Sequence, residues 1–203
     1  MPFRHFIAGL ALLLLLPSLG GCVAAVVGGA AVGASAAHDR RTTGAYVDDK
    51  RIYLAAYNAI NKDKELALQN NVVIVVYDGV MLLAGEVRTG ELKARAERLA
   101  SGFEGTRRIV NELDVREPEG FWSRRRDNTI TAHVKTALLD ITSMPGFDPT
   151  RVNVTTTHRV VYLMGKVTAE ESDAVVEIAR NVAGVERVVK VFDFVDAGPA
   201  AAD

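Results

Sequence analysis

The sequence predicts an α+β protein in which one unit, with the order helix–strand–strand–helix–strand, occurs twice. In each copy, apolar residues at helical spacing precede two short apolar runs joined by a tight turn. A second helical pattern and a last apolar run follow. Matching segments, Gly85-Glu86-Val87 and Gly165-Lys166-Val167, occupy the same place in both copies. Each copy is therefore expected to form a three-stranded sheet with two helices on one face.

The helices are predicted from apolar residues that share one face. The first helices carry Ile52, Ala55, Ala56, Ala59 and Ile60 in one copy and Ile130, His133, Val134, Ala137 and Leu138 in the other. The second helices carry Leu92, Ala96, Leu99, Ala100 and Phe103, and then Val175, Ile178, Ala179 and Val182. Gly105 and Gly184 are expected to end these second helices, because glycine is common after the last helical residue.

The strands are predicted at 72–77 and 80–84, around the turn Asp78-Gly79, which strongly favours a hairpin. Their counterparts are 152–157 and 160–164, and the last strands are expected near 108–115 and 185–195. One such unit buries little surface. Two units packed together would each bury additional surface against the other.

The N-terminus has the pattern of a secretory signal peptide, with Arg4 before a short apolar run. Leu19-Gly20-Gly21-Cys22 has the pattern of a bacterial lipobox, so Cys22 is expected to carry lipid; the alternative is an unmodified cysteine behind an ordinary signal. Val23 follows the cysteine instead of an aspartate, which favours transport to the outer membrane. The expected organisation is a signal peptide (1–21), a lipidated tether (22–45), two domains (46–116 and 129–196) joined by a linker (117–128), and a loose tail (197–203).

Composition and motifs exclude several classes of function. The net charge is −1 and aromatic residues make up 6%, which argues against a nucleic-acid partner. The histidines at positions 5, 38, 133 and 158 lack metal-ligand spacing, and no phosphate-binding loop, dinucleotide fingerprint or nucleophile elbow is present. The acidic pair Asp48-Asp49 is expected to favour a helix N-terminus rather than to act in glycoside hydrolysis. We therefore expect no catalytic residue, metal or cofactor.

The repeats resemble BON domains. The segments that carry the resemblance are 80–87, 160–167, 105–111 and 184–190. With the lipobox, they resemble outer-membrane lipoproteins with two BON domains over nearly the whole chain. The resemblance implies a role in envelope integrity and binding of anionic phospholipid through the first helix of the second unit. One departure is His158-Arg159, where the family usually has glycine in the hairpin, so that turn is expected to be strained or longer.

The phospholipid site is predicted in and before that helix. Phe121, Trp122, Arg124, Arg125 and Arg126 combine aromatic rings, which settle at lipid headgroups, with cations that attract anionic lipid. Thr129, His133 and Thr136 form the polar stripe that follows, with Thr129 at a position where lipid-binding relatives can carry tryptophan. The alternatives are a solvated linker with Trp122 packed at the domain interface, a histidine that is simply packed or solvated at position 133, and an exposed His158.

A second function remains open in the sequence, that of an adaptor for envelope assembly proteins or peptidoglycan-associated machinery. Small sheets have edge strands, and an edge strand can pair with an extended segment of a partner. The sequence alone does not separate this function from lipid binding, and it does not give the oligomeric state.

Overall fold

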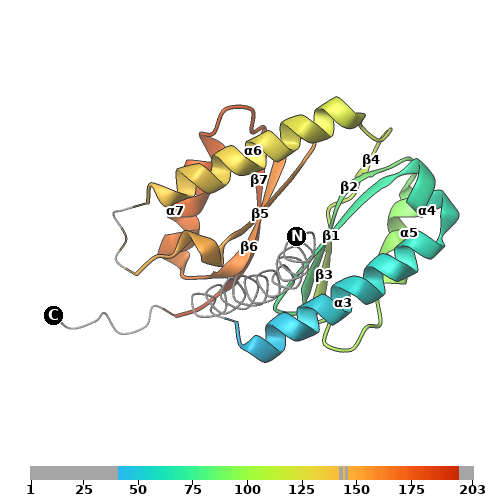
Figure 1. Cartoon of the computed structure of the whole chain (residues 1–203), viewed down its shortest axis with the longest axis horizontal. Coiled ribbons are helices and arrows are strands. Elements are labelled where there is room, and N and C mark those ends of the chain that lie inside the picture. The colour runs from blue at the N-terminus through green and yellow to red at the C-terminus, as the bar shows by residue number, and fades with distance from the viewer. Residues whose placement is uncertain (1–40, 142–143, 145, 197–203) are drawn as a thin grey trace, which may run out of the picture. The chain divides into compact units, whose positions relative to one another are not determined.

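The computed structural model describes residues 41–196 except 142, 143 and 145 (Figure 1). The predicted signal peptide, Cys22, most of the tether and the tail at 197–203 lie outside the described residues. Within them, no helix is both long and apolar enough to cross a bilayer.

The first repeat begins with helix α3 (Thr43–Lys62), which Thr42 caps by accepting a hydrogen bond from the Ala45 N–H. A short helix α4 (Lys64–Gln69), strands β1 (Asn71–Tyr77) and β2 (Val80–Val87), and helix α5 (Gly90–Ala100) follow. The last strand consists of two pieces, β3 (Arg108–Asn111) and β4 (Asp114–Val115). Residues 43–45, predicted to belong to the tether, are therefore helical.

The second repeat has the same order. It comprises helix α6 (Phe121–Leu139), a 3₁₀ turn η1 (Pro149–Arg151), strands β5 (Asn153–Thr157) and β6 (Val160–Val167), helix α7 (Ala169–Arg180) and strand β7 (Arg187–Phe194). The predicted α+β class and the order of elements are thus confirmed. Both second helices end earlier than predicted: α5 ends at Ala100, before Phe103, and α7 ends at Arg180, before Val182. Gly105 and Gly184 lie in the turns before β3 and β7 instead of at helix ends.

Both sheets have the same topology. β1 pairs antiparallel with β2, and β3 and β4 pair parallel with β2 in one continuous register, Leu83 opposite Asn111 and Glu86 opposite Asp114. β5, β6 and β7 repeat this arrangement. β1 and β5 are therefore edge strands, each paired on one side only.

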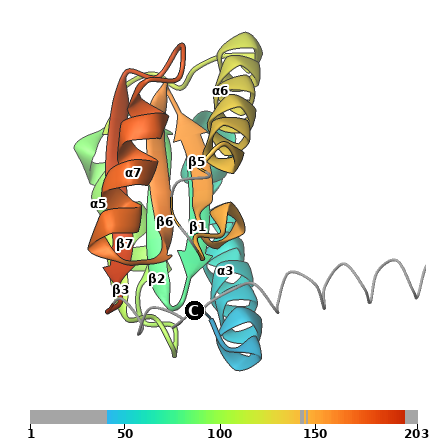
Figure 2. The same cartoon turned by 90° about the vertical axis from the view of Figure 1, so that its left-hand side faces the viewer.

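Three apolar cores hold the described residues together. One lies between the helices and sheet of the first repeat, and one between those of the second. The third lies between the two sheets and contains Tyr77, Val80, Leu82, Ala84, Tyr162, Met164 and Val191. Because side chains alternate along a strand, the side chains on one face of β2 pack in the first core and those on the other face pack in the third core. The layers therefore run helices, sheet, sheet, helices (Figure 1), and each repeat covers the outer sheet face of the other. Figure 2 looks through these layers, with α7 in front of the sheet of the second repeat.

Ion pairs surround the third core. Asp193 of β7 contacts Arg107 and Arg108 of the first repeat, and Lys166 lies 2.8 Å from Asp78. The hydrogen bond to Asp193 raises the pKa of Arg107. These side chains are partly exposed, so each pair contributes at most about 1 kcal/mol. Apolar burial therefore contributes more to joining the repeats than these charges do.

A buried aspartate in the first helix of each repeat holds the hairpin turn of the same repeat. Asp49 accepts hydrogen bonds from the Asp78 and Gly79 N–H groups at 2.7 and 2.8 Å. Asp127 accepts from the His158 and Arg159 N–H groups at 2.8 and 3.0 Å. Asp49 also pairs with Arg41 at 2.7 Å. Asp49 lies beyond the first turn of α3, so the prediction that it favours a helix N-terminus was wrong.

The His158-Arg159 turn has two residues, as Asp78-Gly79 does, and is not longer. All four residues have positive φ: 49° and 73° in the first turn, 48° and 58° in the second. Left-handed backbone is unfavourable for His158 and Arg159, which have a Cβ. The two hydrogen bonds that the Asp127 carboxylate accepts from the turn offset that cost. The predicted strain is therefore present, in a turn of ordinary length.

Candidate functional site

Helix α6 carries all the residues predicted to bind phospholipid, and it begins earlier than expected. The segment predicted as a linker, 117–128, supplies the first two turns of the helix from Phe121. Gly120 precedes the helix without a side-chain cap. Asp127, Ile130, Val134 and Leu138 are the buried residues of α6. The aromatic and basic residues are therefore fixed to a rigid element that the core holds in place.

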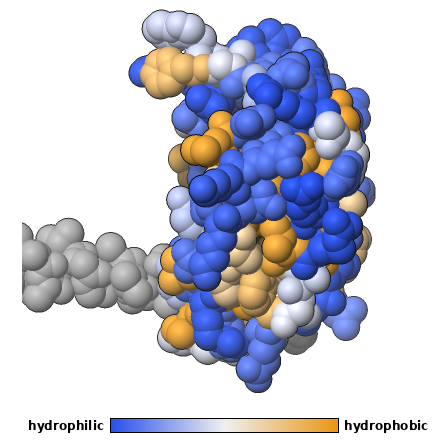
Figure 3. Space-filling model, turned by 90° about the vertical axis from the view of Figure 1, so that its right-hand side faces the viewer, coloured by the Kyte–Doolittle hydropathy of each residue, from blue (hydrophilic) through white to orange (hydrophobic). Residues whose placement is uncertain are grey.

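Two aromatic rings are exposed where α6 begins. Phe121 is 58% exposed and Trp122 is 79% exposed. Their rings meet edge to face, with centroids 5.4 Å apart. The alternative that Trp122 packs at the domain interface was wrong. Figure 3 views the side of the molecule on which α6 begins and shows hydrophobic surface in separate areas between hydrophilic ones.

The three predicted arginines differ in their surroundings. Arg125 is exposed, with its guanidinium 5.7 Å from the centroid of the Phe121 ring. Arg124 is exposed and donates to the Glu119 carbonyl at 3.4 Å. Neither forms an ion pair with a carboxylate within the described residues. Arg126 is only partly exposed and lies 3.6 Å from the Glu119 carboxylate. Two of the three cations are thus available to an anionic ligand.

The polar stripe lies on the same helix as predicted. Thr129, His133 and Thr136 are all exposed, and the Thr129 hydroxyl donates to the Arg125 carbonyl at 3.1 Å. His133 is thus solvated, as are the two threonines of the stripe. The stripe offers polar contacts but no apolar side chain that could enter a bilayer.

Sequence reasoning missed two residues at the other end of the helix. Leu139 is 63% exposed, and Lys135 is exposed one turn before it. The signal was the pair Leu138-Leu139, because two adjacent residues of a helix cannot both face the core. Exposed apolar groups therefore lie at both ends of α6, with the cations Arg124, Arg125 and Lys135 between them.

His158 is not freely exposed, contrary to prediction. Its Nδ1 lies 2.5 Å from a Glu119 oxygen, and its Nε2 contacts Arg116. Glu119 thus contacts both Arg126 and His158, and it ties the segment before α6 to the hairpin of the second repeat. This contact helps to fix where the aromatic end of α6 lies.

Within the described residues, no group of histidine, cysteine, aspartate and glutamate side chains is arranged to hold a metal ion. Asp49 and Asp127 are the buried carboxylates of the first helices, and their oxygens already bind turn N–H groups. These two carboxylates therefore hold the hairpin turns of their own repeats.

Comparison with known proteins agrees with this architecture. The family model described as "BON domain" matches residues 48–117 and 126–196. The chain is 37% identical over 178 residues to Outer membrane lipoprotein DolP of Haemophilus influenzae, covering 88% of this chain and 91% of that protein. It is 36% identical over 158 residues to the 21 kDa hemolysin of Actinobacillus pleuropneumoniae, covering 77% and 79%.

A solved structure, CdsD of the type III secretion system of Chlamydia trachomatis, matches with a TM-score of 0.29 and 16% identity, covering 73% of this chain and 64% of that one. That score is too low to indicate a shared arrangement. The similarity to the Haemophilus lipoprotein, by contrast, confirms the localisation predicted from the lipobox, at the outer membrane with a lipid anchor. The two matched segments show that the chain belongs to the BON-domain family, as a member with two tandem BON domains.

Proposed function

We propose that this protein maintains the integrity of the outer membrane by binding anionic phospholipid, from the periplasmic side, through the exposed face of α6. The role is one of binding and not of catalysis. The observation that carries the proposal is the exposed pair Phe121 and Trp122 beside Arg124 and Arg125, on a helix that the core holds rigid.

The aromatic pair supports contact with the headgroup region. Phenylalanine and tryptophan side chains are stable at the membrane interface, where the indole ring meets both apolar chains and polar headgroups. An exposed tryptophan in water keeps a large apolar surface hydrated. Moving Trp122 into a headgroup layer removes part of that surface from water.

The cations support selectivity for anionic lipid. Arg124 and Arg125 can each donate two parallel hydrogen bonds to a phosphate. Each cation near an anionic surface contributes about 1 kcal/mol, so Arg124, Arg125 and Lys135 together favour an anionic over a neutral bilayer by about 3 kcal/mol. This contribution decreases as salt concentration rises, because the charges are exposed.

The sole tryptophan of the chain gives a direct test. The full lipidated protein is reconstituted in vesicles of phosphatidylcholine alone or with phosphatidylglycerol, and Trp122 emission and quenching by acrylamide are measured. Because the anchor is the same in both, only the contact of α6 differs. We expect a blue shift and protection from acrylamide only with phosphatidylglycerol, both reduced by high salt.

Charge reversal identifies the residues responsible. The double variant Arg124→Glu/Arg125→Glu is expected to lose the blue shift, whereas Arg98→Glu, which reverses an exposed arginine on α5, is expected to keep it. Equal emission from Trp122 in the two kinds of vesicle, or loss of the shift in both variants, would show that α6 does not select anionic lipid.

A further inference from the structure

The backbone groups on the free edge of β1 are not used by the lipid proposal. β1 has the sequence Asn-Val-Val-Ile-Val-Val-Tyr and contains neither a charged residue nor proline. Natural proteins protect edge strands with charges, prolines, bulges or a covering element, because an unprotected edge readily pairs with another strand. The other edge strand, β5, is mostly threonine. β1 is thus the stronger template for pairing.

The hydrogen-bonding groups of this edge follow from the hairpin register. Tyr77 pairs with Val80 across a two-residue turn, so alternate residues of β1 direct their N–H and C=O groups to β2. Val72, Ile74 and Val76 direct theirs to the open side. Among the residues that the structure describes, no backbone group outside the hairpin forms a hydrogen bond with these three.

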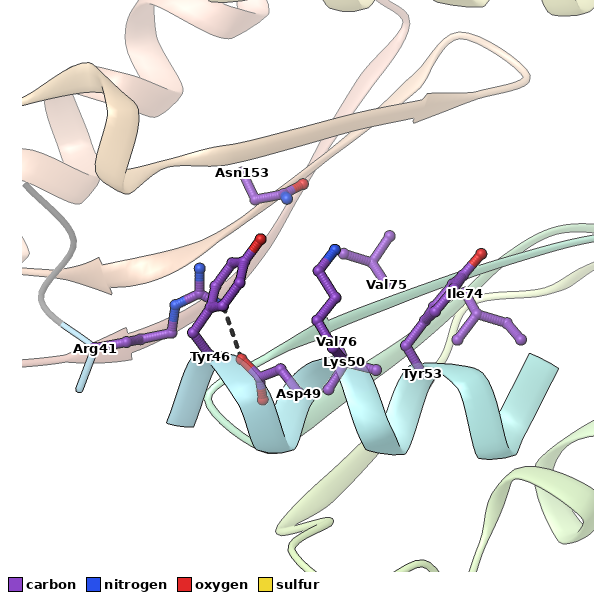
Figure 4. A pocket seen from close by; sticks show the side chains of 9 residues that line it. All are labelled: Arg41, Tyr46, Asp49, Lys50, Tyr53, Ile74, Val75, Val76 and Asn153. Atoms are coloured by element: carbon purple, nitrogen blue, oxygen red, sulfur yellow. Dashed lines mark hydrogen bonds and ion pairs between the residues drawn. The ribbon is translucent and has the colours of Figure 1, made fainter. Parts of the chain in front are cut away.

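The space beside this edge is open. A pocket of about 220 Å³ borders residues 74–76 of β1, with α3 as one wall and Asn153 of β5 opposite. Tyr46 and Lys50 project from α3 to the side on which Asn153 lies, and Tyr53 projects beside Ile74 (Figure 4). A second pocket borders Asn71 and Val73, so open space follows the strand for most of its length. Phe121, Arg124 and Arg125 of α6 also line this second pocket, so this end of the edge adjoins the proposed lipid site.

The wall of the pocket is cationic and rich in hydrogen-bond donors. Lys50 is exposed and has no carboxylate partner within the described residues; its ammonium lies 5.6 Å from the centroid of the Tyr46 ring. Arg41 and Asp49, also at the pocket, pair with each other. The uncompensated charge is therefore that of Lys50, flanked by two tyrosines that can donate hydrogen bonds.

We infer that the edge of β1 beside α3 binds an extended, acidic segment of a partner protein, which adds a strand to the first sheet. Backbone groups of the segment pair with Val72, Ile74 and Val76. An acidic side chain of the segment contacts Lys50, and the tyrosine rings cover the strand. A second copy of this chain fits less well, because antiparallel pairing of two β1 strands would bring two Lys50 side chains toward each other.

The test uses short synthetic peptides and the full chain in a neutral detergent, observed by NMR of backbone amides. The first peptide alternates valine and glutamate. The second replaces each glutamate with lysine, and the third carries N-methyl groups on alternate backbone nitrogens. The first peptide is expected to shift the amides of Val72, Ile74 and Val76. The other two are expected to bind at least tenfold more weakly, because one loses the attraction to Lys50 and the other loses backbone donors.

Two variants of α3 locate the contact. Lys50→Glu is expected to weaken binding of the valine–glutamate peptide about tenfold or more, while Lys62→Glu, an exposed lysine outside the pocket, leaves it unchanged. Equal binding of the N-methylated peptide, or an equal effect of the two variants, would overturn the inference. So would concentration-dependent β1 shifts without peptide, which indicate a second copy. Shifts of the Ile74 and Val76 amides caused by phosphatidylglycerol micelles would also overturn it, because these residues border the pocket that α6 does not line.

Discussion

The first helices of the two domains, α3 and α6, share their buried residues but not their exposed ones. Both bury an aspartate that holds a hairpin turn and three apolar residues after it: Ile52, Ala56 and Ile60 in one, Ile130, Val134 and Leu138 in the other. Their exposed faces differ. α3 presents tyrosines and Lys50, whereas α6 presents Phe121, Trp122 and arginines. Packing against the sheet fixes the buried set, and the exposed face is free to serve a different partner in each domain.

The largest expected effect concerns the paired aspartates. Asp127→Ala removes two charge-assisted hydrogen bonds and leaves the turn N–H groups without acceptors, so we expect a loss of about 3 kcal/mol in the free energy of unfolding. Asp49→Ala also removes the ion pair with Arg41, whose side chain is 12% exposed, and we expect a loss of about 4 kcal/mol. Urea unfolding measures both.

Asp48→Ala is the control for the aspartate pair. Asp48 is adjacent to Asp49 but its side chain is 60% exposed, so we expect a change below about 0.5 kcal/mol. If Asp48→Ala cost as much as Asp49→Ala, the hairpin contact would not be the cause. If Asp127→Ala were neutral, the two domains would not share this support for their turns.

The turns themselves give the next largest effect, and here the two domains should differ. A Cβ at Gly79, which has a φ of 73°, would lie 2.5 Å from the Gly105 carbonyl oxygen. Gly79→Ala is therefore expected to cost about 2 kcal/mol. Arg159→Gly relieves a left-handed residue but removes the ion pair with Glu186, so the two effects nearly cancel and we expect a change below about 1 kcal/mol. Thermal unfolding compares them.

A cost for Arg159→Gly as large as that for Gly79→Ala would contradict this account. It would show that the Arg159 side chain, and not the hydrogen bonds that the turn N–H groups donate to Asp127, keeps the second turn in its conformation. A specific contact of the Arg159 side chain would then stabilise the turn at the position where the family usually has glycine.

Most of the fold was predictable from periodicity, and the differences have physical causes. The spacing that buries one helix face is present in both first helices, at Ile52 and Ile60 and at Ile130 and Leu138. Asp78 and Gly79 are residue types that adopt the positive φ angles of a two-residue hairpin turn. The start of α6 was missed because Gly120 gives no capping signal and the next residues are aromatic and basic instead of periodically apolar. Such residues become helical because the core holds the turns that follow.

The roles of Asp49, Asp127 and Glu119 could not be predicted because their contacts join residues far apart in the sequence. Asp127 meets His158, and Glu119 meets the same histidine from before the helix. The sequence of a strand also does not reveal which of its faces meets a second sheet. Leu82 and Leu83 are equally apolar, but the first lies in the core between the sheets and the second lies under the helices.

Ionisation of Tyr162, in the core between the domains, should make the stability of the protein depend on alkaline pH. Burial raises the pKa of the Tyr162 hydroxyl, since its charged form would be desolvated. The raised pKa contributes stability that is present below the ordinary tyrosine pKa of about 10 and lost as pH rises through the folded value. We expect the melting temperature to fall above about pH 10.

Tyr162→Phe keeps the ring in that core and removes the titrating group. Below about pH 10 it should be slightly less stable than the wild type, because it lacks the hydrogen bond between the Tyr162 and Thr157 side chains. Above that pH it should lose less stability than the wild type as pH rises, as differential scanning calorimetry would show. Parallel curves for the two proteins across the alkaline range would mean that Tyr162 does not govern the contact between the sheets.

The smallest expected effect concerns a charge present in the second domain only. Arg159 donates to Glu186 at 2.6 Å, and this hydrogen bond lowers the pKa of the Glu186 carboxyl. Gly79, the counterpart of Arg159, can form no such pair. A lowered pKa contributes stability that is present above the ordinary glutamate value of about 4.3 and lost as pH falls through the folded one. The pair is exposed, so salt should also weaken it.

Glu186→Gln should therefore lower the melting temperature slightly at neutral pH and not at acidic pH, where wild type and variant become alike. In concentrated salt the difference at neutral pH should shrink, because screening acts on exposed charges. Glu177→Gln, in an exposed i,i+3 pair with Arg180 on α7, serves as the matched control for losing one surface carboxylate. A difference between Glu186→Gln and wild type that persisted unchanged at low pH and in high salt would mean that Glu186 supports the second turn by packing. The two hairpins would then differ by more than one charged pair.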